Sequence, residues 1–202
     1  LDIKTIFDFV ETLDRNTDDL HMIEEAIRVN SEIAEAGSNG DYGLNVGRNI
    51  RMNQEIGLMG KDAVTEAVAA ASSAADARMA GANKPVVTNS GSGNQGITAT
   101  VPIVYAAKYL NIGEDCMFRA VTLSNLIAIH IHAGFGLLSG LCGATIAATG
   151  AACGLVYLLG GNDVQLGYAV NNMLGDVTGM LCDGAKADCA LKVSTCVYAA
   201  FQ

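Results

Sequence analysis

The sequence predicts an all-α or predominantly α fold, and three observations support this prediction. Apolar residues recur at helical spacing over the first 36 positions. Alanine, the residue with the highest helix propensity, is abundant, and only 2 of the 202 residues are proline. Half of the residues are hydrophobic but only 5% are aromatic, so we expect small side chains at close helix contacts.

The N-terminal segment predicts two helices. The first has apolar residues on one face, namely Ile3, Ile6, Phe7, Val10 and Leu13. The second covers residues 20–36 and would be capped by Asn16 or Thr17. A glycine-rich loop is expected over residues 37–47, and an alanine-rich helix over residues 61–80.

A polar loop is expected over residues 85–102. Its centre, Thr88–Gly96, contains only Thr, Asn, Ser, Gly and Gln. A helix would follow, with Thr100 as its N-cap and Pro102 in its first turn. Such a loop can direct backbone N–H groups at an anion, although a surface linker has the same composition. A nucleotide site is weakly supported, because the P-loop spacing and the third glycine of the dinucleotide motif are absent.

From residue 120 to 162 the chain has no Asp, Glu, Lys or Arg. Membrane spans are one explanation of this segment. Two buried helices separated at Gly134 and Gly136 explain it better, because polar residues such as His130 interrupt it and no aromatic belt or basic flank marks an interface.

Charge and cysteine content limit the class of protein. A formal net charge of -9 argues against a nucleic-acid partner. Six cysteines are too few for a disulfide framework, and no signal peptide opens the chain, so we expect reduced cysteines in a cytoplasmic protein. The chain begins at Leu1 and ends at Gln202 without a helix-stop signal, so we expect a piece of a longer polypeptide.

A turn at Asp183-Gly184 is expected to separate a helix over residues 164–181 from a last helix beginning at about Lys186. In one continuous helix, Cys182 and Cys189 would lie about 10.5 Å apart along the axis. They can therefore share one site only if the turn breaks the helix, with Cys182 ending one helix and Cys189 in the first turns of the next.

Cys142 lies near the start of a predicted buried helix, where backbone N–H groups favour a thiolate or an anionic cluster. Cys153 follows in the same helix, roughly 16 Å further along, so these two thiols cannot share a cluster. The same difficulty separates Cys189 from Cys196. The residues alone leave two interpretations open: small buried apolar cysteines, or metal ligands contributed one from each helix.

Three stretches of the chain resemble the L-cysteine desulfidase family, which belongs to the superfamily of the iron–sulfur L-serine dehydratase alpha chain. They are the polar loop TNSGSGNQG before an apolar helix, the stretch SGLCGATIAATGAACG and the stretch MLCDGAKADCALKVST. The resemblance covers residues 75–202 well and the first 70 residues weakly. It implies a serine dehydratase alpha-like helical domain over residues 85–202, preceded by an N-terminal helical segment, residues 1–84, of a truncated larger domain.

The resemblance also implies the site residues. A [4Fe-4S] cluster would be held by Cys142, Cys182 and Cys189. The substrate loop would comprise Thr88, Asn89, Ser90, Gly91, Ser92, Gly93, Asn94 and Gln95. Lys186, between two of the cysteines, is a candidate catalytic base, and a solvated lysine beside the turn is the alternative.

Two features depart from the family pattern. The N-terminal Gly-Cys-Thr-Glu-Pro motif of the family has no match, and His132 stands where the family often has a lysine. A histidine at helical spacing in an apolar stretch is typical of a core residue, so we do not expect His132 to be catalytic.

With three cysteine ligands, a cubane cluster leaves one iron open as a Lewis acid. The resemblance therefore implies a carbon–sulfur lyase that converts L-cysteine to pyruvate, ammonia and sulfide by β-elimination, without pyridoxal phosphate. L-serine dehydration, a non-catalytic metal-binding or redox module, and a plain helical scaffold are alternatives. We expect a homodimer with an amino-acid substrate and neither a membrane nor a nucleic-acid partner, and an isolated fragment without activity.

Overall fold

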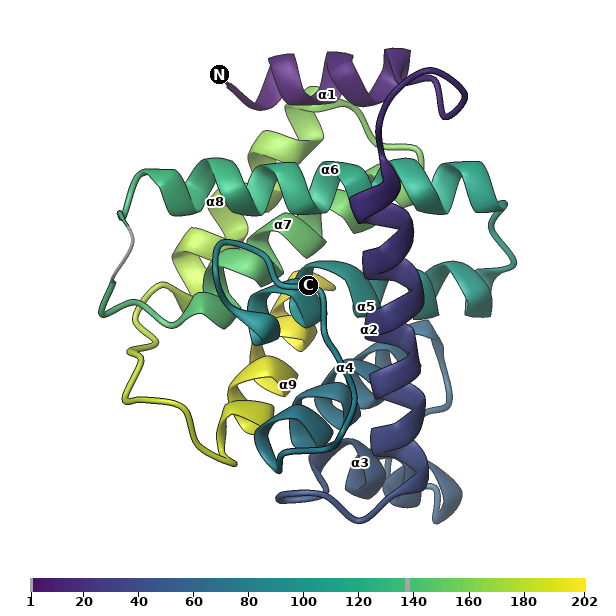
Figure 1. Cartoon of the computed structure of the whole chain (residues 1–202), viewed down its shortest axis with the longest axis vertical. Helices are drawn as coiled ribbons and strands as arrows, with labels where there is room; N and C mark the ends of the chain where they lie inside the picture. Colours follow the sequence, from purple (N-terminus) through teal and green to yellow (C-terminus); the bar gives the residue numbers. More distant parts are fainter. Residues whose placement is uncertain (1, 137–138) are drawn as a thin grey trace.

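The computed structural model describes residues 2–136 and 139–202, which form an all-α domain (Figure 1). The described helices are α1 (Ile3–Thr12), α2 (His21–Asn39), α3 (Val46–Glu55), α4 (Ala63–Met79), α5 (Gly93–Leu110), α6 (Glu114–Ala133), α7 (Gly143–Leu158), α8 (Asp163–Val177) and α9 (Cys189–Ala200). Strand pairing in this part of the chain is limited to two isolated β-bridges. The predicted fold class is confirmed.

The helices before residue 111 differ from the predictions at two places. Helix α2 extends into the predicted glycine-rich loop, and α3 follows where no helix was predicted. Helix α5 begins at Gly93 and not after Thr100, because the Ser92 side chain accepts a hydrogen bond from the backbone N–H of Gln95 and caps the helix there. The predicted cap was therefore wrong, and Pro102 lies inside α5.

The C-terminal helices are shorter than predicted. Residues 178–188 connect α8 to α9, and Cys182 lies in this connection and does not end a helix. Helix α9 begins at Cys189, three residues after the predicted start at Lys186. The predicted break itself is confirmed, and Gly184 adopts a φ of 102° there, which costs glycine no steric strain.

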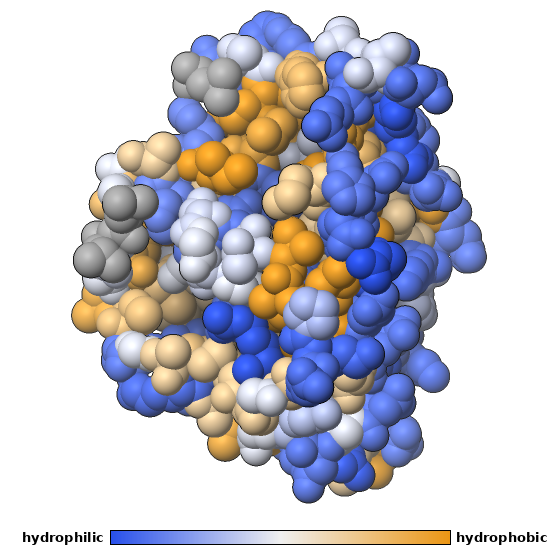
Figure 2. Space-filling model, in the orientation of Figure 1, coloured by the Kyte–Doolittle hydropathy of each residue, from blue (hydrophilic) through white to orange (hydrophobic). Residues whose placement is uncertain are grey.

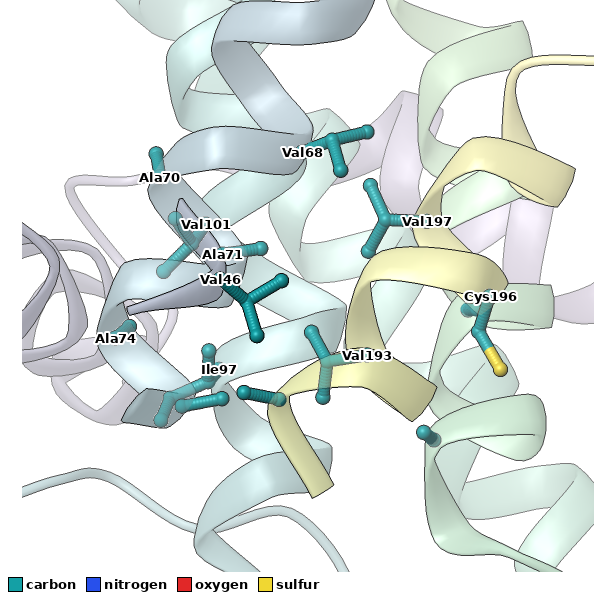
Figure 3. Close-up of a cluster of buried hydrophobic side chains, with 14 of the residues drawn as sticks. Val46, Val68, Ala70, Ala71, Ala74, Ile97, Val101, Val193, Cys196 and Val197 are labelled. Carbon is teal, nitrogen blue, oxygen red and sulfur yellow. The ribbon is translucent and has the colours of Figure 1, made fainter. Parts of the chain in front are cut away.

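Helix α4 lies at the centre of the largest hydrophobic core. It packs against α2, α3, α5 and α9, and every residue from Ala67 to Ala77 is buried. Its small side chains face larger apolar ones on the neighbouring helices, among them Val46, Ile97, Val193 and Val197 (Figure 3). The predicted domain boundary at residue 84 falls between α4 and α5, and helices from both sides contribute to this core.

Glycines allow helix backbones to touch directly at two contacts. A Cβ atom at Gly37 of α2 would overlap the backbone carbonyl of Ser73 on α4. A Cβ atom at Gly150 of α7 would likewise overlap the carbonyl of Ser124 on α6. Side chains of any size at these positions would force the helices apart.

The charged N-terminal segment lies on the surface. Helix α2 buries Ala26, Val29 and Ile33 against the core, while Arg28 on its outer face pairs with Glu25 and Glu32 at 2.8 and 2.7 Å. Figure 2 shows hydrophilic side chains along the edge of the molecule formed by α2. The sequence pattern of this amphipathic helix therefore matches its position.

Within the described residues, α6 is long and apolar enough to cross a membrane by length and composition. Of the 18 consecutive residues of α6 that are most apolar, 50% are buried inside the domain. It packs against α7 along its length and also contacts α5 and α1 (Figure 1). These contacts are those of a core helix, as the sequence predicted for the uncharged stretch that begins at Ala120 within α6.

A buried carboxylate on α4 takes the place of a cap for α3. Asn45, the residue before α3, makes no side-chain capping hydrogen bond. Asp76, only 2% exposed, instead accepts a hydrogen bond from the backbone N–H of Gly47 at 3.2 Å. Burial raises the pKa of Asp76, and hydrogen bonds from the backbone of Gly47, Leu44 and Val46 oppose this shift.

Replacing Gly37 by alanine should destabilise the protein, because the added methyl group would overlap the Ser73 carbonyl. We expect the free energy of unfolding to fall by about 1–3 kcal/mol, as for other overpacked cores. Gly167 on α8 is the matched control, since among the described residues no atom of another segment lies within 4 Å of its Cβ position. Gly167→Ala should instead stabilise by about 0.5–1 kcal/mol through helix propensity. Urea unfolding measures both variants, and changes of the same sign would contradict the close contact.

Asp76→Asn should change the pH dependence of stability. Because folding raises the pKa of Asp76, the native state holds this proton more tightly than the unfolded chain, and the contribution of Asp76 to stability falls as pH rises through its folded pKa. The amide keeps an acceptor for α3 but does not titrate. The free energy of unfolding of the variant, relative to the wild type, should therefore rise from about pH 4 to pH 7 in urea titrations. A flat or falling difference would show that the acid is not held with a raised pKa.

Candidate functional site

Three connecting segments and the starts of three helices surround one pocket of about 190 Å³, called here the cysteine pocket. The segments precede α5, α7 and α9, and Figure 1 shows the last two on the same side of the molecule. The cysteines that the sequence predicted as metal ligands, Cys142, Cys182 and Cys189, all line this pocket. The fold thus brings together thiols that lie up to 47 positions apart in the sequence, from 142 to 189.

Two backbone hydrogen bonds hold the first two of these cysteines side by side. The N–H of Cys142 donates to the carbonyl of Met180 at 3.0 Å, and the N–H of Cys182 donates to the carbonyl of Gly140 at 2.8 Å. In such antiparallel pairing, diagonal neighbours lie on the same face about 7–8 Å apart. The bridge therefore places both thiols on the face that lines the pocket.

The third cysteine enters the pocket from the start of a helix. Cys189 is the first residue of α9, and its thiol lies 3.8 Å from the carbonyl oxygen of Gly184. Cys142 is buried, with 8% of its surface exposed, whereas Cys189 is half-buried and Cys182 is exposed. The thiols are therefore distributed from the base of the pocket to its rim.

The polar loop closes with a tight turn between Asn89 and Ser92, whose backbones exchange hydrogen bonds at 3.1 and 3.0 Å. Ser90 and Gly91 have φ values of 49° and 80°, as in a type I′ turn. Of the predicted substrate residues, Gly91, Ser92 and Asn94 line the cysteine pocket, and Thr88, Asn89, Ser90, Gly93 and Gln95 are not among its lining residues.

Asn89 joins the polar loop to α6. Its amide nitrogen donates to the side chain of Asn125 at 2.9 Å and to the backbone carbonyl of the same residue at 3.1 Å. Its side-chain oxygen accepts a hydrogen bond from the Ser90 hydroxyl at 2.9 Å. With these hydrogen bonds, Asn89 fixes the polar loop to α6.

Lys192 lines the cysteine pocket, whereas the predicted base Lys186 does not. The ammonium group of Lys192 pairs with Asp183 and donates to the carbonyl of Leu181 at 3.2 Å. Lys186 is exposed and pairs with the other carboxylate oxygen of Asp183 at 2.6 Å. Lys186 and Lys192 together hold the pKa of Asp183 well below its usual range, and hydrogen bonding to Asp183 raises the pKa of each lysine.

Sequence reasoning missed both cations that line the pocket, Arg78 and Lys192. Lys192 follows Cys189 by three positions on a helix, so the spacing alone places the two on one face. Arg78 lies in the last turn of α4 and reaches the pocket only because α4 packs against the start of α5. The sequence carries no local signal for that contact.

The buried cysteines differ in what surrounds them. Burial raises the pKa of the Cys142 thiol, while the backbone N–H of Ala144 in the first turn of α7 opposes this shift by favouring the thiolate. Cys153 and Cys196 do not line the pocket, and burial raises the pKa of each to about 12. These two behave as small apolar core residues.

Three thiols, two of them at helix starts, are a donor set of the kind that an iron–sulfur cluster uses. Across residues 2–136 and 139–202, no three His, Cys, Asp or Glu side chains lie close enough to hold one ion. A cluster binds each thiolate at a different iron atom, so its ligands stand further apart than those of one ion. Thiolates are its usual protein ligands, and helix N-termini favour the negative charge. The ligand role of the three cysteines stays a prediction.

A larger pocket of about 320 Å³ lies between α7, α8 and the end of α9. Its lining is mainly apolar, and Tyr168 is its one titratable side chain among the described residues. Catalysis requires convergent polar groups, so the smaller cysteine pocket is the better candidate for an active site.

The fold and the pocket define a class of protein: an α-helical domain with a pocket lined by three cysteines and two cationic side chains. The chain belongs to the serine dehydratase alpha chain family, whose model matches residues 4–202. This match confirms the broader resemblance inferred from the sequence. It also associates the domain with lyases of the serine dehydratase type.

Relatives of similar sequence bear the name UPF0597 protein. One from Clostridium perfringens (strain SM101 / Type A) is 45% identical over 201 residues, which cover 99% of this chain and 47% of the relative. One from Phocaeicola vulgatus is 45% identical over 205 residues, with 99% and 47% covered. One from Actinobacillus pleuropneumoniae serotype 5b is 42% identical over 202 residues, with 100% and 46% covered. The chain thus spans just under half the length of these relatives. No solved structure matches the chain.

Alkylation of the metal-free chain should follow the exposure of the thiols. With iodoacetamide at pH 8, we expect Cys182, which is exposed, to react first. Cys153 and Cys196, whose pKa values are raised to about 12 by burial, should react only after unfolding. Peptide mass spectrometry over time measures the order, and Cys182→Ala is the control for the fast peptide. Rapid labelling of Cys153 in the folded chain would contradict its burial.

Proposed function

We propose that the full-length protein is an iron–sulfur-dependent lyase that converts L-cysteine to pyruvate, ammonia and sulfide by β-elimination. The observation that carries the proposal is the convergence of Cys142, Cys182 and Cys189 on one pocket, in a chain of the serine dehydratase alpha chain family. Two cationic side chains and part of the polar loop line the same pocket, which supports binding of an anionic cofactor and an amino acid together.

The three thiols would hold a [4Fe-4S] cluster, whose iron without a protein ligand would supply a Lewis acid for the substrate carboxylate or the leaving group. The chain offers compensation for the negative charge of the thiolates. Cys142 is the residue before the first turn of α7, and Cys189 begins α9, so both thiolates lie at positive helix ends. Lys192 lines the pocket beside them, and because it shares Asp183 with Lys186, these three side chains together carry a net positive charge.

The polar loop residues Gly91, Ser92 and Asn94 would bind and orient the amino acid where α5 begins. A base takes the proton from Cα, the electron pair of that C–H bond forms the Cα–Cβ double bond, and the Cβ–S bond breaks with its electron pair leaving on sulfide. The released aminoacrylate tautomerises to an imine, which water hydrolyses to pyruvate and ammonia. The overall reaction, from L-cysteine to pyruvate, ammonia and sulfide, involves no net oxidation or reduction.

Two lysines are candidates for the base. Lys186 lies between two of the cysteines in the sequence, and Lys192 lines the pocket. Both are paired with Asp183, and this pairing raises the pKa of each. Either lysine must therefore separate from Asp183 and lose its proton before it can accept one from the substrate.

The whole protein's properties belong to the proposal, because this chain spans just under half of its relatives. We propose a homodimer in the cytoplasm, where a reducing environment keeps cysteine thiols available for a cluster. An amino acid is the proposed small-molecule partner.

Anaerobic preparations of the full-length protein should contain iron and acid-labile sulfide and should release sulfide and pyruvate in equal amounts from L-cysteine. Cys182→Ala should lose both the cluster and the activity. Cys116→Ala is the matched control, since Cys116 is a partly buried cysteine on α6 outside the pocket. A cluster without turnover would favour the non-catalytic metal module, and a colourless protein after reconstitution would favour the helical scaffold; either result contradicts the lyase.

L-serine is the second candidate substrate, because the family description names serine dehydratase. The same elimination from L-serine releases water in place of sulfide. Comparing kcat/KM for the two amino acids under anaerobic conditions assigns the substrate. Faster pyruvate formation from L-serine would replace the desulfidase proposal with a dehydratase.

Lys192→Met should lower kcat for L-cysteine by about 100-fold or more, as removal of a general base does. Lys186→Met should retain most of the activity, because that side chain is exposed and outside the pocket. Steady-state kinetics and iron content of both variants give the comparison. The opposite ranking would identify Lys186 as the base.

A further inference from the structure

We propose that Arg78 binds the carboxylate of the substrate, which makes this a site for substrates that carry a carboxylate and not for thiols or amines in general. The inference rests on the proposed function, because it names the group that recognises the substrate in the same pocket. It depends on three features of Arg78: its position at the edge of the pocket, its lack of an ion-pair partner among the described residues, and the positive electrostatic potential around it.

The position of Arg78 is set by the contact between two helices. Arg78 lies in the last turn of α4, and its side chain packs directly on Gly93, the first residue of α5. A Cβ atom at Gly93 would overlap Nε of Arg78 and lie 2.8 Å from its Cζ. The absence of a side chain at Gly93 therefore leaves room for the guanidinium at the edge of the cysteine pocket, which Arg78 lines.

Arg78 lacks a neutralising partner in the described part of the chain. Its one hydrogen bond goes from a terminal nitrogen to the thioether of Met79 at 3.2 Å, and thioethers are weak acceptors. None of the ion pairs in this part of the chain includes Arg78. Lys192, the other pocket cation, is already paired with Asp183. The guanidinium thus keeps most of its five N–H donors for a ligand.

The surroundings favour a carboxylate. Arg78 lies beside the first residue of α5, and the starts of α7 and α9 line the same pocket, so the backbone adds positive potential from several sides. A planar guanidinium binds a carboxylate through two parallel N–H donors, which fixes orientation as well as position. A substrate held this way by its carboxylate would present Cα and Cβ toward the cysteines.

Steady-state kinetics on the full-length holoprotein test this assignment. Arg78→Met should raise KM for L-cysteine by about 10- to 100-fold, the range expected for losing a charged hydrogen-bond pair, with kcat changed less than threefold. The KM of Arg78→Lys for L-cysteine should fall between those of the wild type and Arg78→Met. Arg28→Met is the matched control, because Arg28 pairs with glutamates on the outer face of α2, and its KM should match the wild type. An unchanged KM in Arg78→Met would overturn the proposal.

Binding measurements separate this inference from the proposed reaction. Calorimetry with 3-mercaptopropionate, which has the thiol and the carboxylate, should show binding that Arg78→Met abolishes. Cysteamine, which lacks the carboxylate, should bind both proteins equally weakly. Arg78-dependent binding in a protein that forms neither sulfide nor pyruvate would refute the lyase and keep the carboxylate site. Turnover with equal binding of both ligands would refute the carboxylate site and keep the lyase.

Two further readouts exclude a purely structural role. Gly93→Ala should reproduce the KM effect with Arg78 still present, because its methyl group displaces the guanidinium; wild-type KM in a folded Gly93→Ala protein would contradict the proposed geometry. Iron and acid-labile sulfide content should stay at the wild-type level in Arg78→Met. A loss of cluster with no change in 3-mercaptopropionate binding would assign Arg78 to the thiolates and overturn its role at the substrate.

Discussion

The close packing of four helices against α4 is the constraint on which the rest of the structure depends. Every residue from 67 to 77 is buried, and the side chains there are almost all Ala, Ser or Val, so α2, α3, α5 and α9 approach its backbone closely. This arrangement brings the end of α4 to the start of α5 and places the start of α9 beside both. The pocket is therefore a product of core packing, although its own residues lie mostly in connecting segments.

Several positive groups around the pocket together favour a negatively charged ligand. Three helix starts, Arg78 and Lys192 contribute positive potential, while the carboxylate of Asp183 is shared between two lysines. Burial of Cys142 raises the pKa of its thiol, and the backbone N–H of Ala144 opposes this shift. A cluster and a substrate carboxylate are both anionic, so one set of positive groups can stabilise each of them.

Much of the fold and part of the site could be predicted from the sequence. The uncharged segment 120–162 and the break at Asp183-Gly184 followed from composition and helix geometry. The grouping of the three cysteines followed from the family resemblance, since helix geometry alone only limited each helix to one ligand. The start of α5 was missed although Ser92 and Gln95 have the spacing of a capping box, because Thr100 with Pro102 two positions later offered a second start signal. The role of Arg78 as a pocket residue could not be predicted from the sequence, since its position depends on a contact between helices.

The pairing of residues 140–142 with 180–182 bears on how the proposed cluster would enter the protein. Two backbone hydrogen bonds, outside any helix, hold these segments together. We expect these bonds to open while the helices stay packed, since local openings in general need less free energy than global unfolding. Insertion of the proposed cluster after synthesis would therefore need only a local separation of these two segments in an otherwise native protein. Its repair after oxidative damage would need the same local separation.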